Sequence, residues 1–231
     1  MAMRSLPLLL LLTGALLAQT PADKAAEAKE ALKALDGWAK MSNAEKSAAI
    51  GKVAAVGGSQ VAHALATKLH DKSAPVRKEI AEALGKMKDD KAVPALITQL
   101  DIEADEKTGD VDVFCAVCEA LGGIGDPRAV QPLVHGVLSG NRREANWQKR
   151  GDARVKALGG IKSKDAIDAL IDLWTRGTAS GGRSATRGTG SNPLSGSIVS
   201  SLNKLTGQNL TDQKAYHEWW KGHKEGFKFP K

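Results

Sequence analysis

Two cysteines, Cys115 and Cys118, have the CxxC spacing, which can serve haem attachment, metal binding or thiol–disulfide exchange. Covalent haem attachment requires a histidine directly after the second cysteine, and Glu119 stands there instead. A structural zinc site requires two further ligands, and the sequence holds no second cysteine pair. Three alternatives remain: two small apolar residues on a buried helix face, a disulfide between Cys115 and Cys118, or a redox pair.

No other group of reactive side chains in the sequence points to catalysis. The histidines form no HExxH or HxH motif, and no serine lies in a nucleophile elbow. The Gly/Ser/Thr-rich stretch 176–197 lacks the Gly-Lys-Ser/Thr of a phosphate loop. The acidic run 101–112 matches a calcium-binding loop only in part, because Glu106 stands where that loop requires glycine. We therefore predict a protein with no enzymatic activity, no metal and no cofactor.

Basic residues gather in the second half of the chain, which favours an anionic partner. Residues 140–231 hold 17 Lys/Arg and 8 Asp/Glu, net +9, whereas residues 19–139 hold 15 and 18, net −3. We predict a protein partner that contacts an edge made of Arg142, Arg143, Trp147, Lys149, Arg150, Arg183 and Arg187. The alternative is that this basic edge pairs with the acidic run 101–112. Since no sustained cluster of basic and aromatic residues occurs, nucleic acid is not expected.

The first 18 residues have the pattern of a secretory signal peptide. Arg4 precedes an apolar run that extends from Leu6 to the small residue Ala18. As a helix, these 13 residues would span only about 20 Å, which is too short to cross a bilayer. We therefore predict cleavage after Ala18, an exported protein (periplasmic or secreted), and no membrane span in the mature chain.

An internal repeat with a step of 37 residues is the strongest pattern in the sequence. The string Ala-Leu-Gly occurs three times at this step, at residues 83–85, 120–122 and 157–159. Each copy is followed by a second apolar segment, whose central leucines are Leu96, Leu133 and Leu170. Because repeats of this length form stacked architectures, the whole chain has to be interpreted as repeating units.

Each unit is predicted to be a pair of helices. Val76, Ile80, Ala83, Leu84 and Met87 recur at the spacing of one helix face. The chain is 42% apolar but only 4% aromatic, a composition that suits small side chains between close helices. Since neither helix of a pair can bury its apolar face alone, the pairs must stack. We predict an all-α fold, an α-solenoid of about five antiparallel helix pairs.

The repeat resembles HEAT repeats, of the short bacterial, phycobilisome-lyase-like kind. The resemblance is carried by residues 71–77 (Asp-Lys-Ser-Ala-Pro-Val-Arg), by Ala83-Leu84-Gly85 and by residues 92–96 (Ala-Val-Pro-Ala-Leu). It implies a scaffold that mediates protein–protein interaction through the concave helix face and the long-loop edge. The alternative is a lyase-like or ligand-binding accessory protein that holds a cofactor or an anionic envelope polymer.

The predicted organisation has four parts: a signal peptide (1–18), a cap helix with HEAT-like repeats (19–175), a Gly/Ser/Arg-rich loop or linker (176–197) and a capping helix pair (198–231). In the last part, Tyr216, Trp219 and Trp220 either close the core or form an aromatic platform for a ligand. The long connections between pairs are expected to lie along one edge of the stack.

Overall fold

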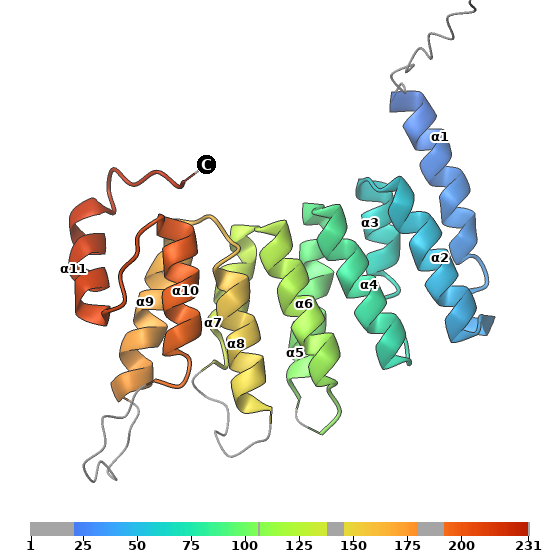
Figure 1. Ribbon diagram of the computed structural model, residues 1–231. Helices are drawn as coiled ribbons and strands as arrows, with labels where there is room; N and C mark the ends of the chain where they lie inside the picture. Colours follow the sequence, from blue (N-terminus) through green and yellow to red (C-terminus); the bar gives the residue numbers. More distant parts are fainter. Residues whose placement is uncertain (1–20, 106, 138–145, 180–191, 231) are drawn as a thin grey trace, which may run out of the picture.

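The computed structural model describes residues 21–105, 107–137, 146–179 and 192–230, and every regular element in these residues is helical. The predicted all-α solenoid is therefore confirmed (Figure 1). The α-helices are α1 (Pro21–Leu32), α2 (Asn43–Val56), α3 (Ser59–Ala66), α4 (Ala74–Met87), α5 (Val93–Ala104), α6 (Val111–Ile124), α7 (Val130–Val134), α8 (Trp147–Leu158), α9 (Lys164–Ala179), α10 (Ser195–Thr206) and α11 (Gln213–His223).

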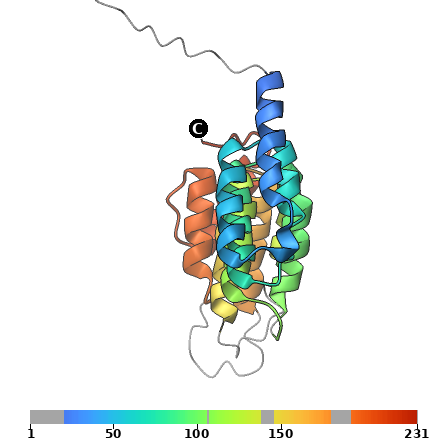
Figure 2. The ribbon, with the colours of Figure 1, turned by 90° about the vertical axis from the view of Figure 1, so that its right-hand side faces the viewer.

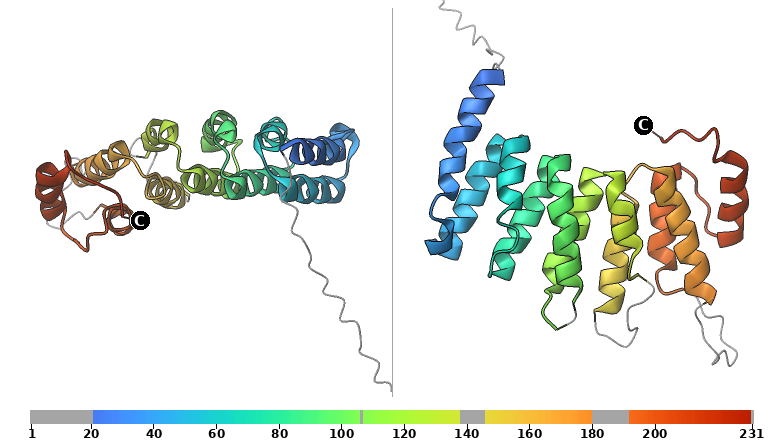
Figure 3. Two further views of the ribbon diagram at one scale, coloured as in Figure 1. Left: turned by 90° about the horizontal axis from the view of Figure 1, so that it is seen from above. Right: turned by 180° about the vertical axis from the view of Figure 1, so that it is seen from behind.

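The helix pairs stack side by side and form two layers. Seen from above, α2, α4, α6 and α8 make one row, and α3, α5, α7 and α9 make the other (Figure 3). Helix α1 packs on α2 and α3 at one end and reaches above the rest of the stack (Figure 2), while α11 packs on α9 at the other end. The ends of α5, α8 and α9 that adjoin the long connections lie at the same edge (Figure 1), as the repeat pattern predicts.

Helix starts are set by capping side chains. At the start of α2, the Ser42 Oγ accepts from the Glu45 backbone N–H, and the Glu45 carboxylate accepts from the Ser42 backbone N–H, a capping box. At the start of α6, the Asp110 carboxylate accepts from the N–H groups of Asp112 and Val113. These side chains satisfy donors that a helix start otherwise leaves unpaired.

Equivalent leucines of the repeat occupy equivalent places in the core. Leu84, Leu121 and Leu158 all have 0% exposure, and so have Leu96, Leu133 and Leu170 in the second segments. The 37-residue step therefore corresponds to one unit of the stack.

Glycine sets the distance between successive helices of the first layer. A Cβ added to Gly85 would lie 2.8 Å from the Ala120 Cα, and one added to Gly122 would lie 2.7 Å from the Ala157 Cα. A Cβ added to Gly159 would lie 2.7 Å from the side chain of Ser201 on α10 and 3.0 Å from the Ser201 Cα. The glycine of each Ala-Leu-Gly string is thus needed for close approach of backbones, as in tightly packed helix pairs.

The boundaries of two predicted segments differ from the helices found. Helix α9 runs to Ala179 and α10 begins at Ser195, so the connection between them is shorter than the predicted linker 176–197. Leu194, which directly precedes α10, is only 1% exposed, so packing against the core already begins within that segment. The predicted signal peptide 1–18 lies outside the described residues. No helix in the described part of the chain is long and apolar enough to cross a bilayer.

Aromatic side chains close the C-terminal end of the stack. Tyr216 and Trp220 are buried, and the Trp220 indole N–H donates to Asp168 of α9 at 2.7 Å. Trp219 lies against Tyr216 at a ring-centroid distance of 6.3 Å. Buried rings with a satisfied polar atom are typical of a core, so this cluster acts as the cap of the solenoid.

A buried carboxylate anchors the N-terminal segment to the repeats. Asp71, whose side chain is 5% exposed, accepts from Lys46 Nζ and from the Trp38 indole N–H, both at 2.7 Å, and from the Ser73 backbone N–H at 2.9 Å. Burial alone would raise the pKa of Asp71, but the hydrogen bonds from Lys46, Ser73 and Trp38 outweigh it and hold the pKa below its usual value.

Acid is therefore expected to weaken this anchor. Because the pKa of Asp71 is lower in the folded chain than in the unfolded chain, its stabilisation is present above about pH 4 and is lost as the pH falls through the folded-state value. We expect D71N to be less stable than wild type at pH 7 and to lose less on acidification, as measured by thermal unfolding between pH 7 and 3. Parallel acid curves for the two proteins would contradict this assignment.

Candidate functional site

A groove between described helices runs along α6 and α8. It has a volume of about 860 Å³, and Lys204 of α10 closes one side. Small residues supply much of its lining: Gly122, Gly123, Ala153, Ala157 and Gly160. The polar and charged residues in the lining are Cys115, Glu119, Gln148, Lys149, Asp152, Lys156 and Lys204. A ligand in this groove would therefore contact small residues and charged side chains together.

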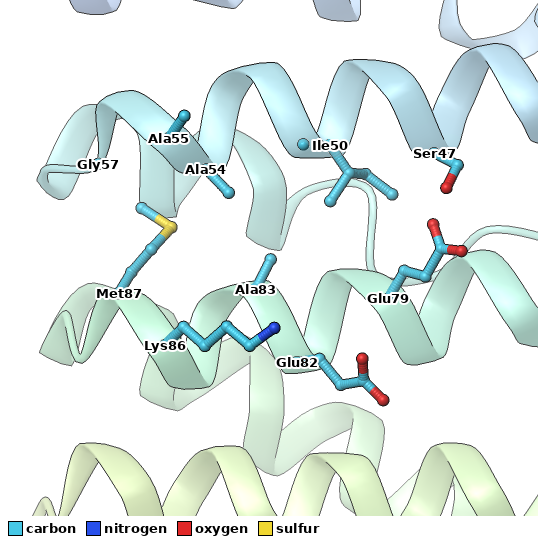
Figure 4. Close-up of a pocket in the computed structure, with 11 residues that line it drawn as sticks. Ser47, Ile50, Ala54, Ala55, Gly57, Glu79, Glu82, Ala83, Lys86 and Met87 are labelled. Carbon is cyan, nitrogen blue, oxygen red and sulfur yellow. The ribbon is translucent and has the colours of Figure 1, made fainter.

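A smaller groove between α2 and α4 shows why the α6–α8 groove is wide. Its volume is about 480 Å³, and Glu79 extends from α4 toward α2 beside Ala83 (Figure 4). Lys86 also belongs to its lining. In the α6–α8 groove, the residues at the same repeat positions, 74 residues later, are Ala153 and Gly160. The short side chain of Ala153, where the smaller groove has Glu79, leaves room for a ligand. Gly160 serves helix contact instead, because a Cβ added there would lie 2.3 Å from the Gly122 carbonyl oxygen.

Some charges in the α6–α8 groove are paired and others are not. Lys149 Nζ lies 2.7 Å from the Asp112 carboxylate, and Asp152 accepts a hydrogen bond from Ser197 Oγ. Lys156, Lys204 and Glu119 are exposed, and none of the three forms an ion pair within the described residues. The groove therefore offers two free ammonium groups and one free carboxylate.

The disulfide, one of the three alternatives for the CxxC pair, is not formed in this structure, where Cys115 and Cys118 are free thiols on helix α6. Their spacing of three residues within a regular helix disfavours the geometry of a disulfide. Cys118 is fully buried, whereas Cys115 is half-buried and lines the groove. Burial raises the pKa of both thiols, and for Cys115 the positive charge of Lys149 opposes that shift. Both residues are therefore protonated thiols at neutral pH.

Alkylation should distinguish the two cysteines. At pH 7, iodoacetamide is expected to modify Cys115 slowly in the folded protein and to modify Cys118 only after unfolding, because Cys118 is inaccessible. Mass spectrometry of intact wild type and C115S would measure this, and C115S should stay unmodified until denaturant is added. Protein that takes no label in denaturant without a reductant would instead contain the disulfide.

The structure divides the residues of the predicted partner-binding edge. Arg142, Arg143, Arg183 and Arg187 lie outside the described residues. Trp147 was predicted at this edge but is only 8% exposed, because its ring packs in the core at the start of α8. Lys149 is the partner of Asp112, and Arg150 Nη2 donates to the Glu103 carbonyl at 3.2 Å. Within the described residues, the basic segment therefore contacts the acidic run 101–112, as the alternative interpretation expected.

The acidic run also contains a buried ion pair that sequence analysis did not identify. Glu103 has 0% exposure, and its carboxylate accepts from Arg77 Nε, from Gln99 Nε2 and from the Asp110 backbone N–H, each at 2.6 Å. Arg77 belongs to the Pro-Val-Arg string of the repeat, and this string was the only feature of the sequence that pointed to a partner for Glu103. This carboxylate is fully used by protein donors, and the described residues contain no cluster suited to a metal ion.

Comparison with known families finds HEAT repeats in the chain. The family described as HEAT repeats matches residues 28–110, and the family described as PBS lyase HEAT-like repeat matches residues 115–138. The second match covers α6 and α7, so it includes one wall of the α6–α8 groove. HEAT repeats suggest protein–protein interaction, as the sequence pattern also predicts.

Two relatives carry the name bilin biosynthesis protein PecE. The one from Mastigocladus laminosus is 48% identical over 60 residues, which are 26% of this chain and 20% of the relative. The one from Nostoc sp. is 43% identical over 101 residues, which are 44% of this chain and 32% of the relative. The matched part is therefore only about a fifth to a third of the length of these relatives.

These matches contradict the prediction that the protein is not an enzyme. The repeat family is described by a lyase, and both relatives are named as biosynthesis proteins. The prediction was wrong because it relied on local catalytic motifs, which a site assembled from successive repeats does not require. The chain contains HEAT repeats, including a PBS-lyase-like repeat, stacked as an α-solenoid.

Proposed function

We propose that the protein is a lyase-like accessory protein that holds a bilin, a linear tetrapyrrole, in the α6–α8 groove. One observation carries the proposal: the segment that matches the PBS lyase HEAT-like repeat forms a wall of the groove of about 860 Å³ between α6 and α8. The two relatives named for bilin biosynthesis support the class of ligand.

The chemistry of the groove suits such a ligand. Between Lys149 and Ala157 the groove follows α8 for about 12 Å, along which an elongated molecule can lie. Gly123 is exposed and Ala153 is partly exposed, so a flat conjugated system can approach the backbone at these two positions. Cys115 and Glu119 place a protonated thiol and a carboxylate beside the ligand, which are groups that can donate and accept a proton.

The scaffold role predicted from the repeats belongs to the same proposal. A protein that acts on a bilin has to deliver it or receive it, and a stack of helix pairs offers an extended surface for a second protein. The groove then serves the ligand, and the remaining helix surface serves the partner.

Export and cleavage after Ala18 are also proposed. The N-terminal residue of the mature protein from its native source would test them: Gln19 is expected, and an intact Met1 would contradict export.

Binding of biliverdin tests the proposed function. We expect a saturable change in its visible absorption on titration with the purified protein, and slower alkylation of Cys115 in the complex, because the bound ligand covers the groove. No absorption change with biliverdin, or binding that leaves Cys115 as reactive as before, would overturn the proposal.

A cysteine in the other groove provides the control. Ser47 is partly exposed, lines the smaller α2–α4 groove and points from α2 toward Glu79 of α4, so S47C in a C115S background places a thiol at a comparable site (Figure 4). Alkylation of Cys115 in wild type should be slowed by biliverdin, and alkylation of the S47C/C115S variant should not. Equal protection of both would indicate non-specific coating of the helix surface.

A further inference from the structure

We infer that the α6–α8 groove selects an elongated dicarboxylate and holds its two carboxylates on Lys156 and Lys204. The inference rests on the proposed function and names the feature of the ligand that the groove recognises. It depends on three observations: the two free ammonium groups, their position in the repeat, and a change of charge sign along the stack.

Lys156 and Lys204 are close neighbours in the register of the stack. Leu158 and Leu202 are equivalent positions of α8 and α10, so Lys204 is equivalent to Gly160, one turn after Lys156. Both side chains are exposed in the lining, and neither has an ion-pair partner among the described residues. Because the ammonium groups of both lysines are available, each can bind one of two carboxylates of the same ligand.

The residues that stand at the position of Lys156 in the preceding repeats show where the carboxylates of the ligand must lie. At steps of 37 residues, the position is Glu82 on α4, Glu119 on α6 and Lys156 on α8. The charge therefore changes sign across the α6–α8 groove, and Glu119 repels carboxylates from the α6 wall. A ligand with two acidic groups is oriented with these groups toward α8 and α10, and its conjugated body lies over Gly122 and Gly123.

A bilin meets this requirement because it carries two propionate groups on its inner pyrrole rings. Ligand and protein can then be changed separately: biliverdin is compared with its dimethyl ester, and wild type with K156Q, K204Q and the double variant. We expect each single variant to weaken biliverdin binding about five-fold, and the ester to bind wild type about twenty-fold more weakly than the acid. The double variant should no longer distinguish acid from ester.

Two further variants complete the test: K86Q is the control, and E119Q is expected to raise the affinity for biliverdin. Lys86 occupies the register position of Lys204 but lies in the α2–α4 groove, so K86Q should leave binding unchanged. E119Q removes the repelling carboxylate and should strengthen binding of the acid about two-fold, without affecting the ester. All variants are at exposed positions, and circular dichroism would verify that each is folded.

The outcomes separate this inference from the proposed function. If biliverdin and its ester bind equally well, or if the double variant still prefers the acid, the dicarboxylate inference is wrong while bilin binding stands. If neither compound binds the wild-type protein, the proposed function fails as well.

Discussion

Replacing Gly122 by alanine is expected to lower the free energy of unfolding by about 2–3 kcal/mol. The added Cβ would lie 2.7 Å from the Ala157 Cα and 2.9 Å from the Ala157 carbonyl oxygen. Both of these atoms belong to the backbone of α8, so no side chain can rotate away, and the two helices have to move apart. Because the core leucines of both helices interlock behind this contact, the separation would weaken packing in two repeats.

The control for this prediction has the opposite sign. Gly51 lies in the middle of α2, and a Cβ added there meets nothing within 4 Å. Since alanine is the better helix former by up to about 1 kcal/mol, G51A should be as stable as wild type or more stable. Urea unfolding followed by circular dichroism would measure both variants. If G122A were as stable as G51A, glycine would not be setting the distance between α6 and α8.

Removing Arg77 is expected to cost about 3–5 kcal/mol, because it leaves the fully buried Glu103 carboxylate without its cationic partner. In R77M, Glu103 keeps the hydrogen bonds from Gln99 and Asp110, but no positive charge compensates its desolvation. This network joins α4, α5 and the start of α6, so its loss should affect the middle of the stack. Thermal and urea unfolding of R77M against wild type would measure the effect.

Two other variants establish the origin of this effect. The double variant R77M/E103Q should be more stable than the sum of the single losses implies, because no buried charge is left uncompensated. K214M removes the exposed pair of Lys214 and Glu218, which are 3.9 Å apart with side chains 83% and 68% exposed, and should change stability by less than about 0.5 kcal/mol. A similar loss for R77M and K214M would rule out desolvation as the cause.

The repeat could be predicted because its pattern is local and recurs. The spacing of Leu84, Leu121 and Leu158 predicted three equivalent core positions, and all three are fully buried. The capping box at Ser42 and Glu45 could likewise be recognised from four consecutive residues. Such features depend on residues within one or two helical turns, whose geometry the helix itself determines.

The candidate site could not be predicted in this way, because its lining comes from three helices that are distant in sequence. Cys115, Lys156 and Lys204 belong to α6, α8 and α10, and only the stacking of these helices brings them to one groove. The net charge of residues 140–231 also included a basic residue that is not on the surface. Arg154 is buried, lies 5.1 Å from the Phe114 ring and donates a hydrogen bond to the Pro132 carbonyl. Net charge counts side chains but does not show which of them the fold buries.

The sequence by itself determined that helices form in pairs and that the pairs stack, because a periodic apolar face can be buried only against the next unit. Tertiary structure alone decided which helices leave a groove between them and which charges stay unpaired there. The reason is that groove width depends on side chains opposite one another in successive repeats, such as Glu79 in one and Ala153 in another. These side chains face one another only after the repeats have packed together.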